Sequence, residues 1–184
     1  MKDNIKVMIY FGIFIVFMII AYVGYNKLVE KENISEDKVI ENKEEKTKLK
    51  EFELYLENGE KISSDEFIGK PMVINVWTSW CGYCDVEMPY FNELYLKEKD
   101  NVTFVMINAT GDRDSKENAK KYIQDSGYLF EIYYDLKLEA ITALGIYSYP
   151  TTIFVDKNGY IDSTNVGLIT KEILQDKINK LKEE

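Results

Sequence analysis

The sequence predicts an α/β domain with a mixed central sheet flanked by helices, preceded by a transmembrane helix. Three observations support this fold class. From residue 51 onward, short β-type runs alternate with helical patterns, which is the order typical of α/β folds. An uncharged apolar run, Val7–Tyr25, precedes that region. Hydrophobic residues make up 46% of the 184 residues, which is enough for one domain to bury a core.

The run Val7–Tyr25 has the length of a membrane-spanning helix. Its 19 residues would form a helix of about 28 Å, close to the roughly 30 Å of a bilayer's hydrocarbon core. A cleaved signal peptide would have a shorter apolar region, about 7–15 residues, ending in small residues. We therefore expect an uncleaved single-pass anchor. Residues 1–6 would form a cytoplasmic tail under the positive-inside rule, and the rest of the chain would lie outside the cell membrane.

Residues 26–50 differ sharply from the apolar run before them. They are rich in lysine and acidic residues and contain no glycine, proline or aromatic residue. Such a mixed-charge tract can form a solvated helix through i,i+4 pairs or remain a loose tether. We interpret it as a charged tether that separates the anchor from a domain at residues 51–184.

Within residues 51–184 the hydrophobic period alternates between two and 3.6. Strands are expected at 52–56, 71–77, 102–109, 130–134, 151–155 and 160–166. The apolar run at 71–77 is typical of a central parallel strand. Helices are expected near 64–67, 81–97, 115–125, 136–144 and 170–181, the last with an apolar face of Ile173, Leu174, Ile178 and Leu181. The Asn58-Gly59 pair signals a hairpin, and a turn at 156–159 returns the last strand antiparallel.

Composition excludes several kinds of chemistry. The chain has no histidine, which removes His-based metal sites and Ser-His-Asp or Cys-His nucleophile systems. Its two cysteines are too few for a Cys₄ zinc site or a disulfide-stapled small fold. With 23 basic and 32 acidic residues the net charge is −9, which argues against nucleic-acid partners. We therefore expect neither a metal nor another cofactor.

The two cysteines, Cys81 and Cys84, follow the predicted central strand and open a predicted helix. Residues i and i+3 lie close on a helical turn, so the sulfurs can form and break a disulfide without backbone movement. The helix N-terminus favours a thiolate, so Cys81 is expected to attack and Cys84 to resolve the mixed disulfide. Two other interpretations of the pair are weaker. The pair could be half of a zinc site, but the chain has no further cysteine or histidine to complete it. A purely structural disulfide over so short a loop would stabilise the fold little. The pattern therefore predicts redox activity.

The tract from Gly69 to Cys84, GKPMVINVWTSWCGYC, resembles the thioredoxin-fold family. Three features narrow the resemblance to the membrane-anchored TlpA/ResA-like branch. They are Asn75 in the strand, the WCxxC motif, and the Glu87-x-Pro89 pattern that follows the motif. The resemblance covers residue 52 onward. It implies an extracytoplasmic thiol–disulfide oxidoreductase that acts on protein disulfides and takes electrons from a membrane donor of the CcdA/DsbD type. Cytochrome c maturation and spore-envelope assembly are the family's better-known settings.

A second family mark is Tyr149-Pro150-Thr151-Thr152. The resemblance implies that the bond before Pro150 is cis and packs beside the CxxC motif. Tyr149 would then offer backbone groups to an extended substrate, by strand addition. Cys84 and Pro150 are 66 positions apart, which is longer than in plain thioredoxin and fits an extra helix and strand in this branch. We assign that insert to residues 115–134.

Four further residues are expected at the site. Glu87 follows Cys84 by three positions on the same helix face, and could be a solvated charge or a group that tunes thiol ionisation. The resemblance favours the second interpretation. Trp80 is expected at the rim of the site, and Trp80, Gly82 and Tyr83 are expected to contact the substrate. Tyr83 replaces a proline that the family often has, which leaves the direction of electron flow open.

Four functions therefore remain to be compared. A disulfide reductase is favoured, for exported substrates such as apocytochrome c or envelope proteins. A dithiol oxidase that forms disulfides, and a non-enzymatic binding module with the same fold, are the alternatives. A peroxiredoxin-type peroxidase is disfavoured, although Thr78-x-x-Cys81 matches part of that motif. Ile74 stands where the motif has proline, and Arg113, the only arginine, is not at the motif's arginine position.

Overall fold

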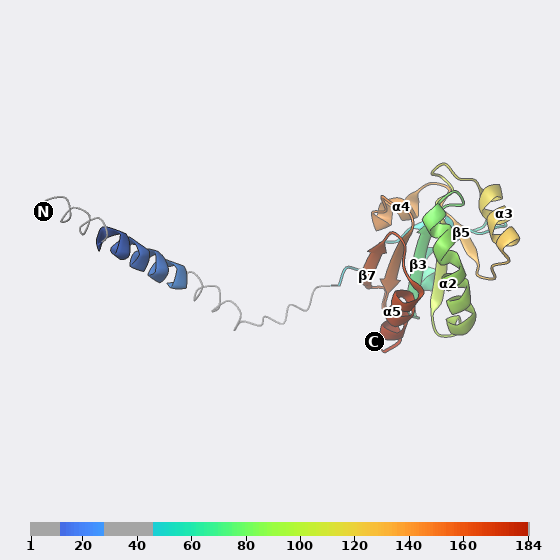
Figure 1. Ribbon diagram of the computed structural model, residues 1–184. Coiled ribbons are helices and arrows are strands. Elements are labelled where there is room, and N and C mark those ends of the chain that lie inside the picture. The colour runs from blue at the N-terminus through green and yellow to red at the C-terminus, as the bar shows by residue number, and fades with distance from the viewer. Residues whose placement is uncertain (1–11, 28–45, 184) are drawn as a thin grey trace, which may run out of the picture. The chain divides into compact units, whose positions relative to one another are not determined.

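The computed structural model describes residues 12–27 and 46–183 (Figure 1). The chain divides into two units, one ending at Glu45 and one beginning at Lys46. The predicted cytoplasmic tail at 1–6, the start of the predicted anchor at 7–11 and most of the predicted tether, at 28–45, lie outside the described residues. Within the described ranges, no helix is both long and apolar enough to cross a membrane. The anchor and the domain boundaries therefore stay predictions.

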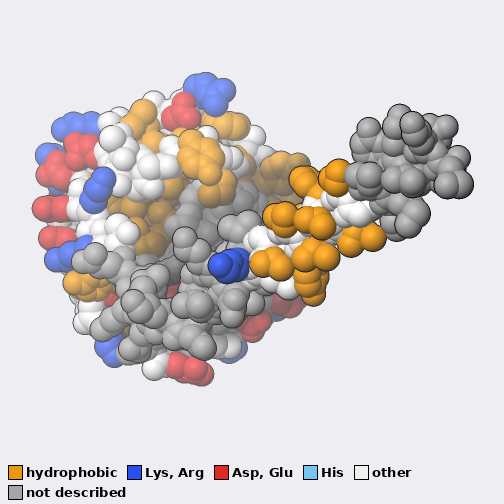
Figure 2. Space-filling view, turned by 90° about the vertical axis from the view of Figure 1, so that its left-hand side faces the viewer, with side chains coloured by type: hydrophobic (Ala, Val, Ile, Leu, Met, Phe, Trp, Pro, Cys, Tyr) orange, Lys and Arg blue, Asp and Glu red, His pale blue; other side chains and the backbone are white. Residues whose placement is uncertain are grey.

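Residues 12–27 form a helix whose described side chains are all exposed. Its large apolar residues include Phe14, Phe17 and Tyr22, with exposed fractions of 59%, 67% and 66%. Figure 2 shows hydrophobic side chains over the visible face of this helix. Water alone is an unfavourable surrounding for an apolar surface of this kind.

The second unit is built around a seven-stranded mixed sheet in the order β2-β1-β5-β4-β3-β6-β7. β3 pairs with β4 in parallel and β4 with β5 in parallel, whereas the remaining pairs are antiparallel. The strands are β1 (Glu53–Tyr55), β2 (Lys61–Ser63), β3 (Met72–Trp77), β4 (Thr103–Asn108), β5 (Ile132–Tyr134), β6 (Thr151–Val155) and β7 (Ile161–Val166). The predicted mixed sheet is confirmed, with the apolar run of β3 near its centre.

Helices cover both faces of the sheet, as predicted. They are η1 (Ser64–Phe67), α2 (Gly82–Glu98), α3 (Lys116–Ser126), α4 (Glu139–Leu144) and α5 (Lys171–Glu183). Side chains of α2, α3 and α5 share one buried cluster, and α4 and η1 pack into the cluster on the opposite face. In Figure 1, α2 and α5 lie side by side in front of the sheet, which agrees with their direct contacts.

The strand that leads to the cysteines is buried on both faces. Val73 and Trp77 of β3 join the cluster under α2, whereas Met72, Ile74 and Val76 join the opposite cluster. This alternation follows from the two-residue period of a strand. By the same period, Asn75 lies on the α2 side, where it is a fully buried polar residue among apolar ones.

The predicted insert forms a crossover next to this strand. α3 begins after the N-cap residue Ser115, and β5 then adds beside β4 in parallel. A parallel neighbour requires such a crossover because the chain must return to the same end of the sheet. Because β4 itself runs parallel to β3, the loop from β4 into α3 lies at the end of the sheet where the cysteines follow β3.

Two predicted details are wrong. Ile173 of α5 is 47% exposed, so the buried face of this helix consists of Leu174, Ile178 and Leu181. Consecutive residues lie about 100° apart around a helix, and Ile173 therefore falls outside the apolar stripe that contains Leu174. Helix α4 begins at Glu139 instead of residue 136, because Leu138 takes a left-handed backbone conformation with φ of 59°.

Candidate active site

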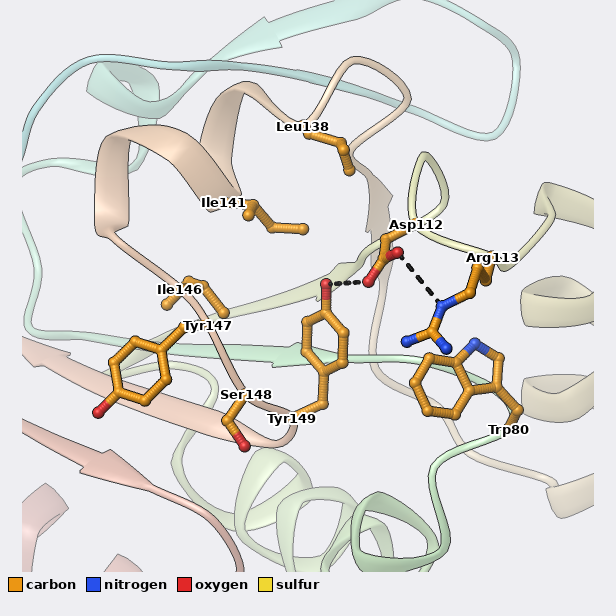
Figure 3. A pocket seen from close by; sticks show the side chains of 9 residues that line it. All are labelled: Trp80, Asp112, Arg113, Leu138, Ile141, Ile146, Tyr147, Ser148 and Tyr149. Atoms are coloured by element: carbon orange, nitrogen blue, oxygen red, sulfur yellow. Dashed lines mark hydrogen bonds and ion pairs between the residues drawn. The ribbon is translucent and has the colours of Figure 1, made fainter.

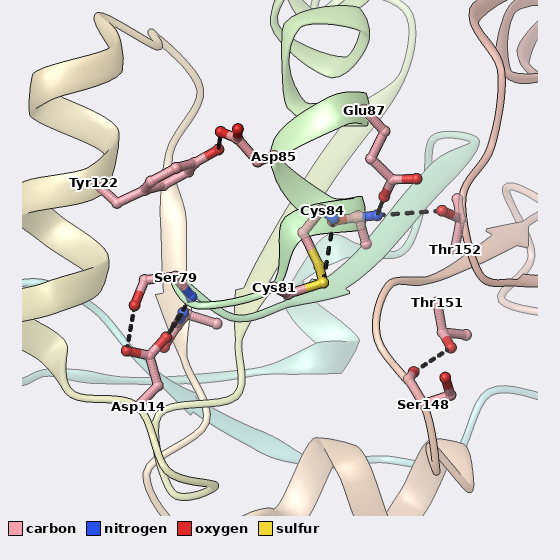
Figure 4. Close-up of a disulfide and its surroundings, with 12 residues drawn as sticks. Ser79, Cys81, Cys84, Asp85, Glu87, Asp114, Tyr122, Ser148, Thr151 and Thr152 are labelled. Atoms are coloured by element: carbon pink, nitrogen blue, oxygen red, sulfur yellow. Dashed lines mark hydrogen bonds between the residues drawn. A yellow bond between two sulfur atoms is a disulfide. The ribbon is translucent and has the colours of Figure 1, made fainter.

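Three segments that are far apart in the sequence meet at one end of the sheet. They are the turn from β3 into α2, the loop from β4 into α3, and the residues just before β6. β4 runs parallel to β3 and β6 runs antiparallel to it, so the ends of β3 and β4 and the start of β6 share one edge. Figure 3 and Figure 4 show side chains from these segments converging there. This carboxyl edge is where α/β sheets commonly bind ligands.

The turn from β3 into α2 carries the cysteine pair as a disulfide. The Cα atoms of Cys81 and Cys84 are 5.2 Å apart. Cys81 is the N-cap residue of α2, and its Sγ accepts a hydrogen bond of 3.2 Å from the Cys84 backbone N–H (Figure 4). Cys81 is 8% exposed and Cys84 1%. In the reduced protein, the amide and the helix N-terminus would both stabilise a thiolate on Cys81, which suits the predicted attacking role.

A carboxylate from the β4–α3 loop holds the residues just before Cys81. Asp114 accepts hydrogen bonds from the Ser79 backbone N–H and hydroxyl, at 2.6 and 2.7 Å (Figure 4). It also accepts bonds from the Asn108 side-chain amide at 2.9 Å and the Ser115 N–H at 2.8 Å. One side chain thus joins the end of β4, the start of α3 and the approach to the disulfide.

The predicted cis bond between Tyr149 and Pro150 is confirmed. The ring of Tyr149 packs edge-to-face against Trp80, with centroids 6.0 Å apart, and its hydroxyl donates a 3.0 Å hydrogen bond to Asp112 (Figure 3). Burial and the neighbouring Asp112 carboxylate raise the pKa of the Tyr149 hydroxyl above its usual range. The hydroxyl therefore stays protonated and continues to donate.

Glu87 is fully buried, one turn after Cys84 on α2. Its carboxylate accepts a 2.7 Å bond from the Asn75 side-chain amide and a 3.0 Å bond from the Ile169 N–H. Burial raises the pKa of Glu87 to about 7, although these two bonds act in the opposite direction. The interpretation of Glu87 as a solvated charge is therefore wrong, and near neutral pH this carboxyl can gain or lose a proton.

Asn75 connects Glu87 to the strand that follows the cis proline. Its Nδ2 donates both to Glu87 and to the Thr152 hydroxyl, the latter at 3.2 Å. Its Oδ1 is buried and has no hydrogen-bond partner among the residues that the structure describes. An unpaired buried acceptor is costly, and here it lies on the amide that contacts the titrating carboxyl.

The other predicted site residues lie on the surface around the disulfide. Trp80 is 48% exposed and Tyr83 67% exposed. Gly82 is exposed as well, and a Cβ at this position would meet no atom within 4 Å. The outer face of the CxxC turn is thus open and aromatic, as a surface that contacts a polypeptide should be.

Three residues of the site belong to no sequence motif that would mark them as site residues. Asp112, Arg113 and Asp114 come from the β4–α3 loop, and Asp114 meets Ser79 across 35 positions. The only hint was their place after a buried strand and just before a predicted helix. Within residues 12–27 and 46–183, no group of three or more cysteine or acidic side chains is arranged to hold a metal ion.

Comparison with known proteins gives consistent matches. Residues 46–164 match the model of the AhpC/TSA family. The chain is 33% identical over 118 residues to the thiol-disulfide oxidoreductase ResA of Geobacillus thermodenitrificans, covering 64% of this chain and 66% of that protein, just under two thirds. It is 30% identical over 163 residues to the thioredoxin-like protein YneN of Bacillus subtilis, covering 88% and 92%. The crystal structure of StoA from Bacillus subtilis aligns with a TM-score of 0.62 at 27% identity, covering 71% of this chain and 97% of that one.

Proposed function

We propose that this chain, which belongs to the AhpC/TSA family and has a thioredoxin-like fold, is a thiol–disulfide oxidoreductase that works as a membrane-anchored, extracytoplasmic disulfide reductase. In each cycle the Cys81 thiolate attacks a substrate disulfide and releases one substrate thiol. Cys84 then displaces the second substrate thiol and closes the Cys81–Cys84 disulfide. Two electrons pass from the enzyme dithiol to the substrate disulfide.

The observation that carries the reductase direction is the buried carboxyl of Glu87, one turn after Cys84. A reductase needs a dithiol that gives up its electrons readily, so its thiolate must not be strongly stabilised. A carboxylate in the apolar layer beneath α2 disfavours a second negative charge nearby. A carboxyl with a pKa of about 7 can also take up and return the proton that moves during resolution.

One observation favours the opposite direction, a dithiol oxidase. The Cys84 N–H and the N-terminus of α2 both stabilise a thiolate on Cys81, which would make the disulfide more oxidising. The reduction potential of the Cys81–Cys84 couple decides between these functions. We expect a value near the roughly −270 mV of thioredoxin, whereas a value near −120 mV, as in DsbA, would make the protein an oxidase.

The proposed anchor rests on the uncharged run Val7–Tyr25 and on the exposed apolar side chains of the helix at 12–27. To test it, a single cysteine is added in the tether at 26–50, in a Cys81→Ser, Cys84→Ser background. An impermeant thiol reagent should label it in intact cells, and the chain should sediment with membranes. Labelling only after lysis would contradict the outward orientation.

We propose a membrane thiol transporter of the CcdA/DsbD type as the electron donor, and exported proteins such as apocytochrome c or envelope proteins as substrates. The family acts on protein disulfides in general, and the open aromatic rim suits a polypeptide. Removal of the donor should leave Cys81 and Cys84 oxidised in cells, as measured by alkylation of free thiols after acid quenching. An unchanged reduced fraction would point to another donor.

A further inference from the structure

A pocket of about 390 Å³ opens beside the Trp80–Tyr149 pair (Figure 3). It lies between the approach to the disulfide, the β4–α3 loop, the start of α4 and the residues before Pro150. Its volume is in the range of sites that hold a small ligand or one to two side chains. The pocket is therefore continuous with the candidate active site but is not used by the disulfide exchange itself.

The two sides of the pocket differ in chemistry. Leu138, Ile141 and Ile146 form an apolar side contributed by α4 and the residues that flank it. On the other side, the Arg113 guanidinium lies over the Trp80 ring, 4.8 Å from its centroid. Figure 3 shows the terminal nitrogens of Arg113 directed toward the ring and the Tyr149 side of the pocket. An occupant should thus have an apolar part and an acceptor of hydrogen bonds.

Arg113 retains donors for such an acceptor. Its Nε lies 3.5 Å from Asp112, whose other oxygen already accepts from the Tyr149 hydroxyl. A guanidinium has five N–H donors in a planar fork, so this pair leaves the terminal nitrogens available. The side chain is 76% exposed. Because Arg–carboxylate pairs can be bidentate, a carboxylate is the acceptor that fits this group best.

The backbone holds both sides of the pocket in place. Among the described residues, Arg113 and Leu138 are the two non-glycine residues with positive φ, at 56° and 59°, and both line the pocket. Gly111 links the loop that carries Arg113 to the segment that carries Leu138, because its N–H donates a 3.0 Å hydrogen bond to the Asp135 carbonyl. The two segments are close here, since a Cβ on residue 111 would lie 2.8 Å from the Leu138 side chain. Backbone outliers of this kind persist where the surrounding structure determines the shape of a site.

A peptide is the occupant that the surroundings favour. Within residues 12–27 and 46–183, neither backbone polar group of Tyr149 is bonded to another backbone group. An extended substrate segment can therefore pair with Tyr149 while its cysteine faces Cys81. Side chains on one face of that segment would then point toward the pocket.

Building on the proposed disulfide exchange, we infer that this pocket selects peptide substrates with an apolar residue and an acidic residue next to the target cysteine. The apolar side chain packs against Ile141 and Ile146, and the carboxylate binds Arg113. In a chain of net charge −9, a single arginine beside the disulfide thus makes acidic segments acceptable substrates.

The test uses the full-length chain, reduced beforehand, in single-turnover reactions with short peptide disulfides. One peptide carries Phe-Glu beside its cysteine, a second Phe-Gln and a third Ala-Glu, and each is made with the pair on either side. The half-saturating concentration should be about fivefold lower for Phe-Glu than for Phe-Gln, the effect of one partly exposed charge pair. Arg113→Gln should reduce this ratio to about one, and Arg113→Lys should restore part of it.

Two variants complete the design. Lys121→Gln on α3 removes an equally exposed charge, 75% exposed, and should keep the fivefold ratio. Ile146→Ala shortens a side chain on the apolar side of the pocket, and it should lower the preference for Phe-Glu over Ala-Glu. An equal ratio in wild type and Arg113→Gln would overturn the inference. Failure of the wild type to reduce the small neutral hydroxyethyl disulfide would instead overturn the proposed function.

Discussion

The Glu87 carboxylate accepts a 2.7 Å hydrogen bond from the Asn75 side-chain amide, although both side chains are fully buried. The amide belongs to β3 and the carboxylate to α2, so the bond links the central strand to the helix that carries the disulfide. It gives Glu87 a defined partner in an apolar layer and limits how far burial can raise its pKa.

Glu87 should make the stability of the protein depend on pH. Its pKa is about 7 in the folded chain and 4.5 when unperturbed, so between these values the folded state binds more protons than the unfolded state. The contribution of Glu87 to the free energy of unfolding is therefore fully present below pH 4.5 and is lost as the pH rises through 7. The loss corresponds to about 3 kcal/mol.

Glu87→Gln should remove that dependence, because glutamine does not titrate and the unpaired Asn75 Oδ1 can accept from its amide after the Asn75 side chain turns. The free energy of unfolding of the oxidised chain, measured with denaturant at pH 5 and at pH 8, gives this pH dependence. Glu93→Gln, on the exposed side of α2, is the matched control and should behave like wild type. Equal pH dependence in wild type and Glu87→Gln would contradict the prediction.

Asn75→Ala should raise the pKa of Glu87 above 7. The Asn75 amide donates to the carboxylate and so favours its charged form, and its removal leaves desolvation less opposed. The protonated carboxyl band in infrared spectra, followed against pH, reports the change. Thr152→Val leaves both hydrogen bonds of Glu87 in place and should shift the band's titration little. A lower pKa in Asn75→Ala would show that the amide does not stabilise the charge.

Asp114→Ala should destabilise the protein by about 1–3 kcal/mol. The change leaves the Ser79, Asn108 and Ser115 donors without their shared acceptor in a partly buried place. It should also slow disulfide exchange, because the residues before Cys81 lose their attachment. Asp125→Ala removes an exposed partner of Lys121 and should change the free energy of unfolding by less than about 0.5 kcal/mol. Similar losses in the two variants would mean that Asp114 is an ordinary surface residue.

Cys84→Ser should accumulate mixed disulfides with substrates, since Cys81 can attack but nothing resolves the product. Cys81→Ser should trap few, because Cys84 is 1% exposed and lies behind the N-cap residue. Non-reducing gels of cells that express each variant compare the yields. Equal trapping, or more trapping by Cys81→Ser, would reverse the assigned roles.

Local patterns in the sequence predicted most of the domain's secondary structure. The apolar run of β3, the start of α3 next to Ser115 and the Asn58-Gly59 turn all lie where expected, because each depends on neighbours within a few residues. The CxxC motif likewise placed Cys81 at the head of α2. The start of α4 was missed since the left-handed conformation of Leu138 has no signal in a leucine.

The sequence by itself determined the α/β fold of the domain and the place of the cysteine pair, since these follow from hydrophobic period and spacing, and the family resemblance implied the cis proline. Only the tertiary structure decided the surroundings of that pair. Glu87 is buried because Ile169, 82 positions away, and Asn75 of β3 close over it. Arg113 reaches Trp80 because β4 runs parallel to β3, so the loop after β4 lies at the same edge of the sheet as the turn that carries the disulfide. Burial, and with it the pKa of a carboxyl, depends on which distant segments pack together, and no local pattern encodes that.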